Sequence, residues 1–261
     1  MIPSIGFGTF RLKKDDIDIA LPHAIANGYN HIDTALAYNN QEFIANALGK
    51  NGIDRDKLWL TSKVGLKPKK NSKKSTLTIK QSIEKCLQDL NTKFIDLVLI
   101  HSPTDQKEDI NTWNTLEEYH KQGYIKHIGV SNFKEDELQN ILDNCVIKPY
   151  TNQIELSPFF VRNDLVKFCK DNNIIVTGHS SLVKGEKFDD KTICKLADEY
   201  KTSPAQILLQ WSKQNDYVVL PRSSQKNHIV ENISTDFLIC DNDMFQLNNL
   251  DCRYATHPQY V

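Results

Sequence analysis

The 261-residue sequence lacks the long apolar runs that membrane-spanning proteins need. No stretch approaches the roughly 18 uninterrupted apolar residues of a transmembrane helix. Residues 1–6 carry neither a basic segment nor a sustained apolar one, so we expect no signal peptide. The sequence therefore predicts a cytoplasmic protein without a membrane partner.

An excess of charge of one sign is also missing. The 32 lysines and arginines nearly balance the 33 aspartates and glutamates, which leaves a formal net charge of −1. Such a balance creates no overall field that attracts nucleic acid. One basic stretch, residues 67–74, could bind phosphate, but no aromatic side chains are interleaved in it to stack on bases. We interpret it as a solvated loop and expect no nucleic-acid partner.

Closely spaced cysteines are absent as well. The six cysteines are scattered, with no Cys-x-x-Cys pair and no spacing typical of a zinc site. This pattern favours free thiols in a reducing compartment over a disulfide framework, and it predicts no metal centre. With 39% hydrophobic and 25% charged residues, the chain has the composition of a globular protein that can bury a large core.

What the chain does contain is a regular alternation of short β-rich runs and longer amphipathic segments. The predicted strands are residues 5–9, 30–33, 59–63, 97–101, 125–130, 151–154, 174–177 and 217–220. The predicted helices are residues 16–27, 41–48, 76–90, 112–121, 135–144, 163–172, 204–213 and 225–232. Strand–helix units that repeat from end to end without a break in composition predict an α/β protein, a (β/α)8 TIM barrel that forms a single domain over residues 1–261.

The competing fold is an open, doubly wound sheet. That fold would need a glycine-rich turn between the first strand and the first helix. Gly6 and Gly8 are followed by Thr9, Phe10 and Arg11, so the third glycine of the dinucleotide-binding fingerprint is missing. The barrel is therefore the better prediction.

Four polar residues stand at or just beyond the ends of predicted strands. Asp33, Lys63 and His101 end the second, third and fourth strands, and Tyr38 lies five residues after the second. In a barrel these ends converge on one small volume. A lysine ammonium beside a phenol would lower the tyrosine pKa from its ordinary value of about 10, and Asp33 would hold the ammonium in place. His101 could orient a substrate carbonyl. The set predicts proton transfer from Tyr38.

Each of these residues also has an alternative interpretation. Asp33 could cap a helix, Tyr38 could be a loop aromatic, and His101 could be a buried histidine bonded to backbone. Lys63 could be an exposed charge at a strand end, or the Schiff-base lysine of an aldolase.

Taken together, the motifs resemble those of the aldo-keto reductases, which are NADPH-dependent carbonyl reductases on a (β/α)8 barrel. The resemblance runs nearly end to end, and its strength lies in the order and spacing of several short motifs. They are residues 6–10 (GFGTF), 31–35 (HIDTA) with Tyr38, 61–63 (TSK), 95–101 (IDLVLIH), 128–133 (IGVSNF), 152–155 (NQIE) and 221–223 (PRS).

The resemblance implies a role for each candidate residue. Tyr38 would be the general acid, Lys63 and Asp33 the pair that tunes its pKa, and His101 the residue that orients the carbonyl. Ser131, Asn132 and Gln153 match positions that bind the nicotinamide carboxamide, although a helix cap is an alternative for the first two. Arg222 and Ser223 match the 2′-phosphate site, and Glu231 and Asn232 match positions near the adenine. The other implied cofactor-binding residues are Thr9, Asp33, His179, Ser180, Leu182 and His228.

The chain departs from the family pattern at several positions. His179 replaces the tyrosine that stacks on the cofactor, which reduces the stacking area. His228 replaces an arginine near the 2′-phosphate. NADPH is still the expected cofactor because of Arg222, but the change at His228 makes NADH use possible. Gln41 replaces a glutamate, for which we expect a structural effect only.

The predicted substrate pocket contains Tyr38 and His101 together with two further departures. Phe10 and Ser102 stand where tryptophan is frequent, which predicts a more open and less aromatic pocket. The short segment after residue 251 also favours a permissive site, and the hairpin that usually closes the barrel bottom is expected to be mostly absent. We therefore expect a monomeric reductase of aldehydes, and of some ketones. The alternative function is that of a low-turnover regulatory protein that binds the cofactor, motivated by His179 and His228.

Overall fold

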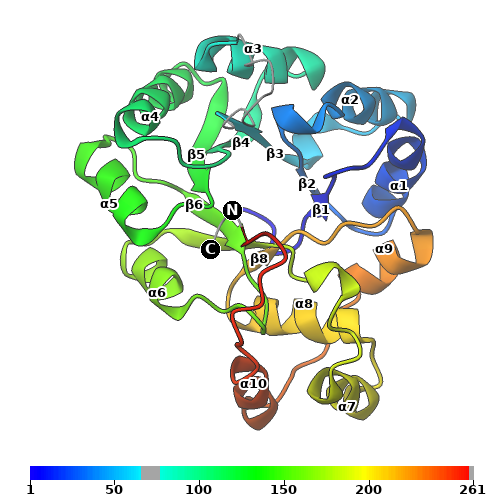
Figure 1. Ribbon diagram of the computed structural model, residues 1–261. Helices are drawn as coiled ribbons and strands as arrows, with labels where there is room; N and C mark the ends of the chain where they lie inside the picture. The colour runs from blue at the N-terminus through cyan, green and yellow to red at the C-terminus, as the bar shows by residue number, and fades with distance from the viewer. Residues whose placement is uncertain (66–76, 259–261) are drawn as a thin grey trace.

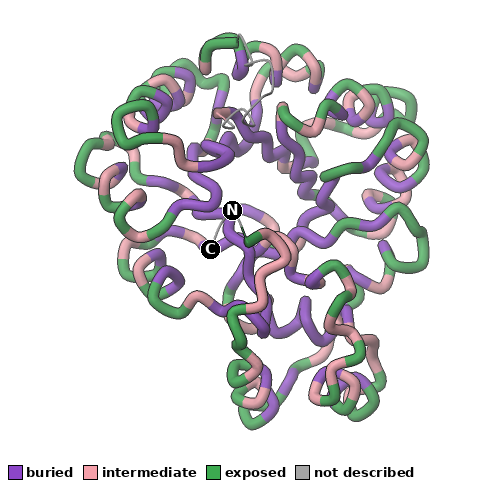
Figure 2. The backbone as a smooth tube through the Cα atoms, viewed as in Figure 1, coloured by how far each residue is buried: buried purple, intermediate pink, exposed green. Residues whose placement is uncertain are grey.

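The computed structural model describes residues 1–65 and 77–258 of the chain (Figure 1). The basic stretch at 67–74 lies outside the described residues. In the described part, ten α-helices surround a central ring of eight strands. The burial pattern follows this arrangement, because the strands and the inner faces of the helices are buried while the outer faces of the helices are exposed (Figure 2).

The strands of the described residues are parallel and pair in sequence order. They are β1 (Phe7–Gly8), β2 (His31–Asp33), β3 (Trp59–Val64), β4 (Ile95–Ile100), β5 (Ile125–Ser131), β6 (Thr151–Glu155), β7 (Ile175–His179) and β8 (Val218–Val219). A parallel bridge between Ile5 and Val219 joins the first and last strands and closes the ring. The predicted (β/α)8 barrel is confirmed, and β1 and β8 are shorter than predicted.

The α-helices of the described residues are α1 (Lys14–Ala26), α2 (Gln41–Lys50), α3 (Ile79–Asp89), α4 (Gln106–Lys121), α5 (Glu135–Asn144), α6 (Asn163–Asp171), α7 (Lys191–Tyr200), α8 (Pro204–Gln214), α9 (Lys226–Ile233) and α10 (Asp241–Asn248). Three short 3-10 helices are η1 (Leu36–Tyr38), η2 (Arg55–Lys57) and η3 (Val183–Gly185). The sequence prediction missed α7 and α10, because one helix per strand already satisfied the repeat. It also began α4 too late, since Asp105 caps that helix by accepting a hydrogen bond from the Glu108 backbone.

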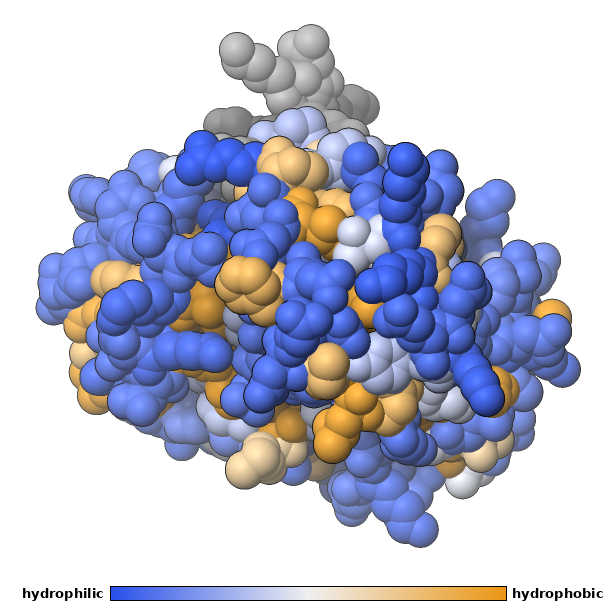
Figure 3. All heavy atoms as spheres, turned by 90° about the horizontal axis from the view of Figure 1, so that it is seen from below, coloured by the Kyte–Doolittle hydropathy of each residue, from blue (hydrophilic) through white to orange (hydrophobic). Residues whose placement is uncertain are grey.

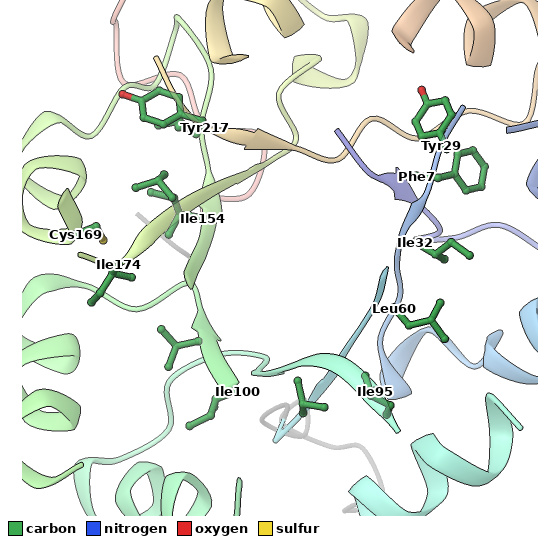
Figure 4. Close-up of a cluster of buried hydrophobic side chains, with 14 of the residues drawn as sticks. Phe7, Tyr29, Ile32, Leu60, Ile95, Ile100, Ile154, Cys169, Ile174 and Tyr217 are labelled. Atoms are coloured by element: carbon green, nitrogen blue, oxygen red, sulfur yellow. The ribbon is translucent and has the colours of Figure 1, made fainter. Parts of the chain in front are cut away.

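The main hydrophobic core lies between the outer face of the barrel and the helices. In α1 the buried residues are Ile17, Ala20, Leu21 and Ala24, whose spacing places them on one face of the helix. Figure 4 shows barrel residues such as Ile32 and Leu60 on the side of the strands that faces the helices. Complete burial of each large aliphatic side chain contributes about 1.5–3 kcal/mol.

The inside of the barrel changes from apolar at the bottom to polar at the top. Ile2, Leu97, Leu99 and Val218 form a small buried cluster, in which Leu97 and Val218 lie nearer the amino ends of their strands. The residues before β1 form no hairpin in the described structure, and Ile2 occupies this end of the barrel. As alternate residues of each strand point inward, the next inward positions toward the carboxyl ends carry polar groups.

The GFGTF motif meets a packing requirement at the closure of the barrel. A Cβ atom on Gly6 would lie 2.6 Å from His31 Nδ1, and one on Gly8 would lie 2.9 Å from the Leu220 carbonyl oxygen. Contacts this short do not occur between real atoms, so β1 can approach β2 and β8 this closely only with glycine at both positions. Glycine at these positions therefore brings Thr9 and Phe10 to the top of the barrel.

The outer surface shown in Figure 3 is mostly hydrophilic, and its apolar residues lie in small separate groups. In the described part of the chain, no helix has the length and apolar character needed to cross a membrane. All six cysteines are free thiols.

Candidate active site

A buried ion pair lies at the centre of the barrel mouth. Lys63 Nζ is 2.5 Å from Asp33 Oδ1, and it also donates to the Thr34 carbonyl oxygen at 3.0 Å. Both charged side chains are almost completely buried. Burial alone would lower the pKa of Lys63, but the Asp33 carboxylate and the Tyr38 phenol outweigh it, so this pKa is raised. Lys63 is therefore a fixed positive charge.

The phenol of Tyr38 lies next to this charge. The third contact of Lys63 Nζ is Tyr38 Oη at 3.4 Å, and the ammonium is 5.1 Å from the centre of the Tyr38 ring. The position of Tyr38 at the end of η1 is braced by Asn40, whose side chain accepts from Thr34 Oγ1 and donates to the Thr9 carbonyl oxygen at 2.8 Å. The buried amide of Asn40 thus ties the loop after β2 to the loop after β1.

Two aromatic neighbours define the direction in which Tyr38 faces. The Phe10 ring lies 4.9 Å from the Tyr38 ring in a tilted arrangement, and the His101 ring lies 5.8 Å away edge-on. Phe10 is 43% exposed, whereas Ser102 is buried beside His101. The four predicted pocket residues therefore follow β1, β2 and β4, and Phe10 is the most exposed of them.

His101 is a buried, neutral imidazole. Burial, followed by the nearby Lys63 ammonium, lowers the pKa of His101 to about 3. Its backbone N–H donates to the Val64 carbonyl oxygen at 2.7 Å, which fixes its position beyond β4. Its Nδ1 atom has no hydrogen-bond partner among the described residues. A neutral imidazole at this place can hydrogen-bond an uncharged carbonyl oxygen.

The predicted carboxamide-binding residues lie at the ends of β5 and β6. Ser131 Oγ donates to the Gln153 carbonyl oxygen at 2.9 Å, and Asn132 Nδ2 donates to Ser131 Oγ at 3.0 Å. The alternative that Ser131 and Asn132 cap a helix is wrong, because the N-cap of α5 is Lys134. The Gln153 side chain makes a contact that the sequence did not predict, a hydrogen bond of 2.8 Å from its Nε2 to Asp33 Oδ2.

The cofactor-binding candidates after β1 and β7 lie on the same rim. The backbone and side chain of Thr9 both donate to the Asp33 carbonyl oxygen, at 3.0 and 2.9 Å. His179 ends β7 and is hydrogen-bonded to Asn132, while Ser180 and Leu182 follow it before η3. Thr9 therefore contacts Asp33 of the ion pair, and His179 contacts Asn132.

The remaining candidates form a separate group at the start of α9. Arg222 and His228 are exposed, whereas Ser223 and Asn232 are buried and Glu231 is half-buried. Ser223 Oγ accepts a hydrogen bond of 3.0 Å from the Gln225 backbone. This group combines an exposed guanidinium with the N-terminus of a helix, which is suited to a phosphate group.

Two residues at the mouth, Glu155 and His257, were not predicted from the sequence. Glu155, at the end of β6, accepts hydrogen bonds from the backbone of Thr256 and His257 and from the Thr256 hydroxyl. The His257 ring then lies 5.9 Å from that of His179. The C-terminal segment runs from α10 toward the barrel axis in Figure 1. The only sequence signal was the match of Glu155 to the NQIE motif, which assigns it no partner.

Gln41 has a structural contact, as expected. It is buried, and its Oε1 accepts a hydrogen bond of 2.6 Å from Ser62 Oγ. Because Ser62 precedes Lys63 in β3, this contact helps to hold the strand that carries the lysine.

Comparison with known proteins agrees with this geometry. Residues 4–251 match the model of the Aldo/keto reductase family. The chain is 33% identical to the glyoxal reductase of Bacillus subtilis, over 98% of this chain and 92% of the relative. It is 34% identical to a methylglyoxal reductase of Yersinia pestis, over 99% and 92% of the two chains.

A solved structure shows the same fold. The aldo-keto reductase MGS-M4, from a deep-sea metagenome library of the Medee basin, superimposes with a TM-score of 0.91 at 30% identity, covering 98% of this chain and 93% of that one. Residues 4–251, which match the family model, include all of the candidate site residues. The chain belongs to the Aldo/keto reductase family, and it is an NAD(P)H-dependent oxidoreductase of carbonyl compounds.

Proposed function

We propose that the chain reduces small aldehydes, and some ketones, with NADPH, and that Tyr38 is the general acid. The observation that carries the proposal is the contact between Tyr38 Oη and Lys63 Nζ, in which the lysine is itself fixed by Asp33. A positive charge beside the phenol favours the phenolate that remains after the proton leaves. The chain thus holds a proton donor whose product state is stabilised.

The donor groups present at the mouth fit a nicotinamide cofactor. Ser131, Asn132 and Gln153 supply hydroxyl and amide groups at one end, which suits the donors and acceptors of a carboxamide. Arg222 and the start of α9 supply positive charge at the other, which suits the extra phosphate of NADPH. The exposed imidazole of His228 is compatible with NADH as a weaker alternative.

The chemistry that a bound nicotinamide supplies is hydride transfer to the carbonyl carbon. Tyr38 donates its phenolic proton to the carbonyl oxygen, so the product is an alcohol and the residue becomes a phenolate. His101 is neutral and holds the carbonyl oxygen toward Tyr38 by a hydrogen bond. Lys63 keeps its proton throughout, since its role is electrostatic.

The substrate class follows from the relatives and from the pocket. The relatives include enzymes named as glyoxal and methylglyoxal reductases, so we propose small aldehydes with a neighbouring carbonyl group as the first substrates to test. The exposed ring of Phe10 also offers an apolar surface to larger aldehydes. A monomer in a reducing compartment such as the cytoplasm is part of the same proposal, and the six free thiols support the compartment.

The raised pKa of Lys63 argues against the aldolase alternative. A Schiff base requires a neutral amine that can attack a carbonyl, and the ion pair with Asp33 keeps Lys63 as an ammonium.

The test is NADPH consumption with a panel that includes methylglyoxal and benzaldehyde. Tyr38→Phe removes the donated proton while keeping the ring, so we expect turnover to fall about 100-fold or more with NADPH binding retained. Full activity in Tyr38→Phe would contradict the assignment of the acid. Tight NADPH binding without turnover by the natural chain would instead support the regulatory alternative.

A further inference from the structure

Both ring nitrogens of His179 are hydrogen-bonded. Its Nε2 lies 2.9 Å from Asn132 Oδ1, and its Nδ1 lies 3.1 Å from Ser180 Oγ. Burial, followed by the nearby His257 and Lys63, lowers the pKa of His179 well below the ordinary range, so the imidazole is neutral. A neutral imidazole has one donor and one acceptor nitrogen, and the neighbours decide which is which.

The contacts of Asn132 determine the direction of these hydrogen bonds. Asn132 Nδ2 donates to the His101 carbonyl oxygen at 3.1 Å and to Ser131 Oγ at 3.0 Å, so the atom that faces His179 is the acceptor oxygen. His179 Nε2 must therefore carry the proton, and Nδ1 accepts from the Ser180 hydroxyl. The Asn132 amide is thus held from the ends of three strands, with His179 as its only donor among the described residues.

The backbone of Asn132 is also distinctive. Its φ angle of +63° lies in the left-handed region, where the side chain leaves the strand direction of β5. One lone pair of Oδ1 accepts from His179, which leaves the other lone pair for a ligand. Loss of the His179 donor would leave Oδ1 without the hydrogen bond that fixes its direction.

The C-terminal segment also contacts the His179 ring. The His257 ring meets it edge-on, at an interplanar angle of 78°. Glu155 holds this segment in place through the backbone of Thr256 and His257, and Lys184 Nζ donates to the Thr256 carbonyl oxygen at 2.7 Å. The ring is therefore held in an orientation set by hydrogen bonds and by an edge contact.

We propose that His179 is a positioning residue that directs Asn132 Oδ1 toward the carboxamide of the nicotinamide, and that it contributes to cofactor binding by this hydrogen bond and not by ring stacking. The inference rests on the proposed function, because it assumes that a nicotinamide cofactor binds at this rim. The two modes of action make opposite demands on the side chain. Positioning needs a donor at the place of Nε2, whereas stacking needs a flat ring.

Two substitutions separate these demands. His179→Gln keeps an amide N–H near the position of Nε2 but removes the ring. His179→Phe keeps a flat ring but removes both hydrogen bonds. We expect His179→Gln to bind NADPH within about 2-fold of the natural chain, and His179→Phe to bind about 3- to 10-fold more weakly, as is typical for the loss of one oriented hydrogen bond.

The measurement is the dissociation constant by titration calorimetry, with NADPH and with 2′,5′-ADP as a matched probe that has no nicotinamide. Both His179 variants should bind 2′,5′-ADP like the natural chain, which also shows that they are folded. Arg222→Gln provides the converse control, since it should weaken binding of both compounds. An effect of His179→Phe on NADPH but not on 2′,5′-ADP assigns the contribution to the nicotinamide end.

The outcomes are distinct. NADPH binding by His179→Phe that equals or exceeds that of the natural chain would overturn the positioning role, and weak binding by His179→Gln alone would favour stacking. Equal affinities for all three proteins would also overturn it, while leaving the reductase assignment intact. No NADPH binding by the natural chain would instead reject the proposed cofactor, and the inference with it.

Discussion

Gln153 donates its side-chain amide to Asp33 Oδ2 at 2.8 Å, on the carboxylate oxygen that Lys63 does not occupy. The two residues are 120 positions apart in the chain and meet across the inside of the barrel. Asp33 therefore has a charged partner on one oxygen and a neutral donor on the other. A buried carboxylate needs such partners, because its desolvation is otherwise uncompensated.

Replacement of Gln153 by leucine should destabilise the protein. The change leaves Asp33 Oδ2 buried without a donor, which costs about 1–3 kcal/mol in the free energy of unfolding. Urea unfolding followed by circular dichroism provides the measurement. Gln139→Leu, on the exposed face of α5, is the matched control and should stay within about 0.5 kcal/mol. Equal effects at the two positions would show that the hydrogen bond to Asp33 contributes nothing.

Removal of one partner of the ion pair should cost more than removal of both. Lys63→Met leaves a buried, uncompensated Asp33 carboxylate, and we expect a loss of about 3–5 kcal/mol. The double variant Asp33→Leu/Lys63→Met removes both charges and should recover part of that loss. Neither protein should reduce aldehydes, because the charge beside Tyr38 is gone. A double variant less stable than Lys63→Met would contradict this account of the pair.

The local part of the active site could be predicted from the sequence. Asp33 ends β2 and Lys63 is the penultimate residue of the neighbouring parallel strand β3, and the barrel geometry alone brings such ends together. The (β/α)8 fold follows from the repeat of strand and helix patterns. These features depend on contacts between segments that are near in sequence or adjacent in the sheet.

Contacts across the barrel could not be predicted in the same way. The hydrogen bonds from Gln153 to Asp33 and from Thr256 to Glu155 join residues more than 100 positions apart, and no local pattern encodes them. The resemblance assigned Gln153 to cofactor binding and His179 to cofactor stacking. The hydrogen bonds of Gln153 to Asp33 and of His179 to Asn132 were therefore not expected. The helix α7 was missed for a different reason, since the strand before it, β7, already had a predicted helix at residues 204–213.

Acid should destabilise the protein through its buried histidines. Burial lowers the pKa of His31 to about 4 and that of His101 to about 3, from an ordinary value of 6.5. Between the lowered pKa of each histidine and 6.5, the unfolded chain binds a proton at that histidine and the folded chain does not. The free energy of unfolding therefore falls as the pH falls below 6.5. Each histidine should contribute a loss of about 2 kcal/mol between pH 7 and pH 5.

The check is a comparison of urea unfolding at these two pH values. His31→Gln and His101→Gln cannot take up the proton, so each variant should lose about 2 kcal/mol less than the natural chain over this range. Carboxylates titrate alike in all three proteins and cancel in the comparison. An unchanged pH dependence in either variant would show that the corresponding imidazole is protonated in the folded state.

Arg222 should determine the preference for NADPH over NADH. Its guanidinium is exposed just before α9, where it can bind a phosphate through two hydrogen bonds. We expect Arg222→Gln to weaken NADPH binding about 10-fold and to leave NADH binding unchanged, since a charge-assisted hydrogen bond is worth roughly 1.5–3 kcal/mol. His228→Gln, on α9, should have a smaller effect. Equal losses for both cofactors in Arg222→Gln would place the residue away from the 2′-phosphate.

The hydrogen bonds between Glu155 and Thr256 should stabilise the C-terminal segment as a coupled pair. Glu155 Oε1 accepts from both the backbone and the hydroxyl of Thr256, at 2.5 and 2.8 Å, and the carboxylate is buried. In Glu155→Gln one of the two acceptor oxygens becomes an NH2 donor, so at least one backbone N–H group loses its acceptor. We expect a loss of about 1–3 kcal/mol in the free energy of unfolding. Thr256→Val removes only the hydroxyl and should cost less.

A double-mutant cycle of Glu155→Gln and Thr256→Val tests the pair directly. If the hydroxyl bonds the carboxylate, the combined loss should be smaller than the sum of the single losses by about 0.5 kcal/mol or more. Thr192→Val, on α7 and away from the segment, is the control and should add to Glu155→Gln without coupling. Strict additivity at Thr256 would show that the hydroxyl does not bond this carboxylate in solution, because the removal of one partner would then leave the contribution of the other unchanged.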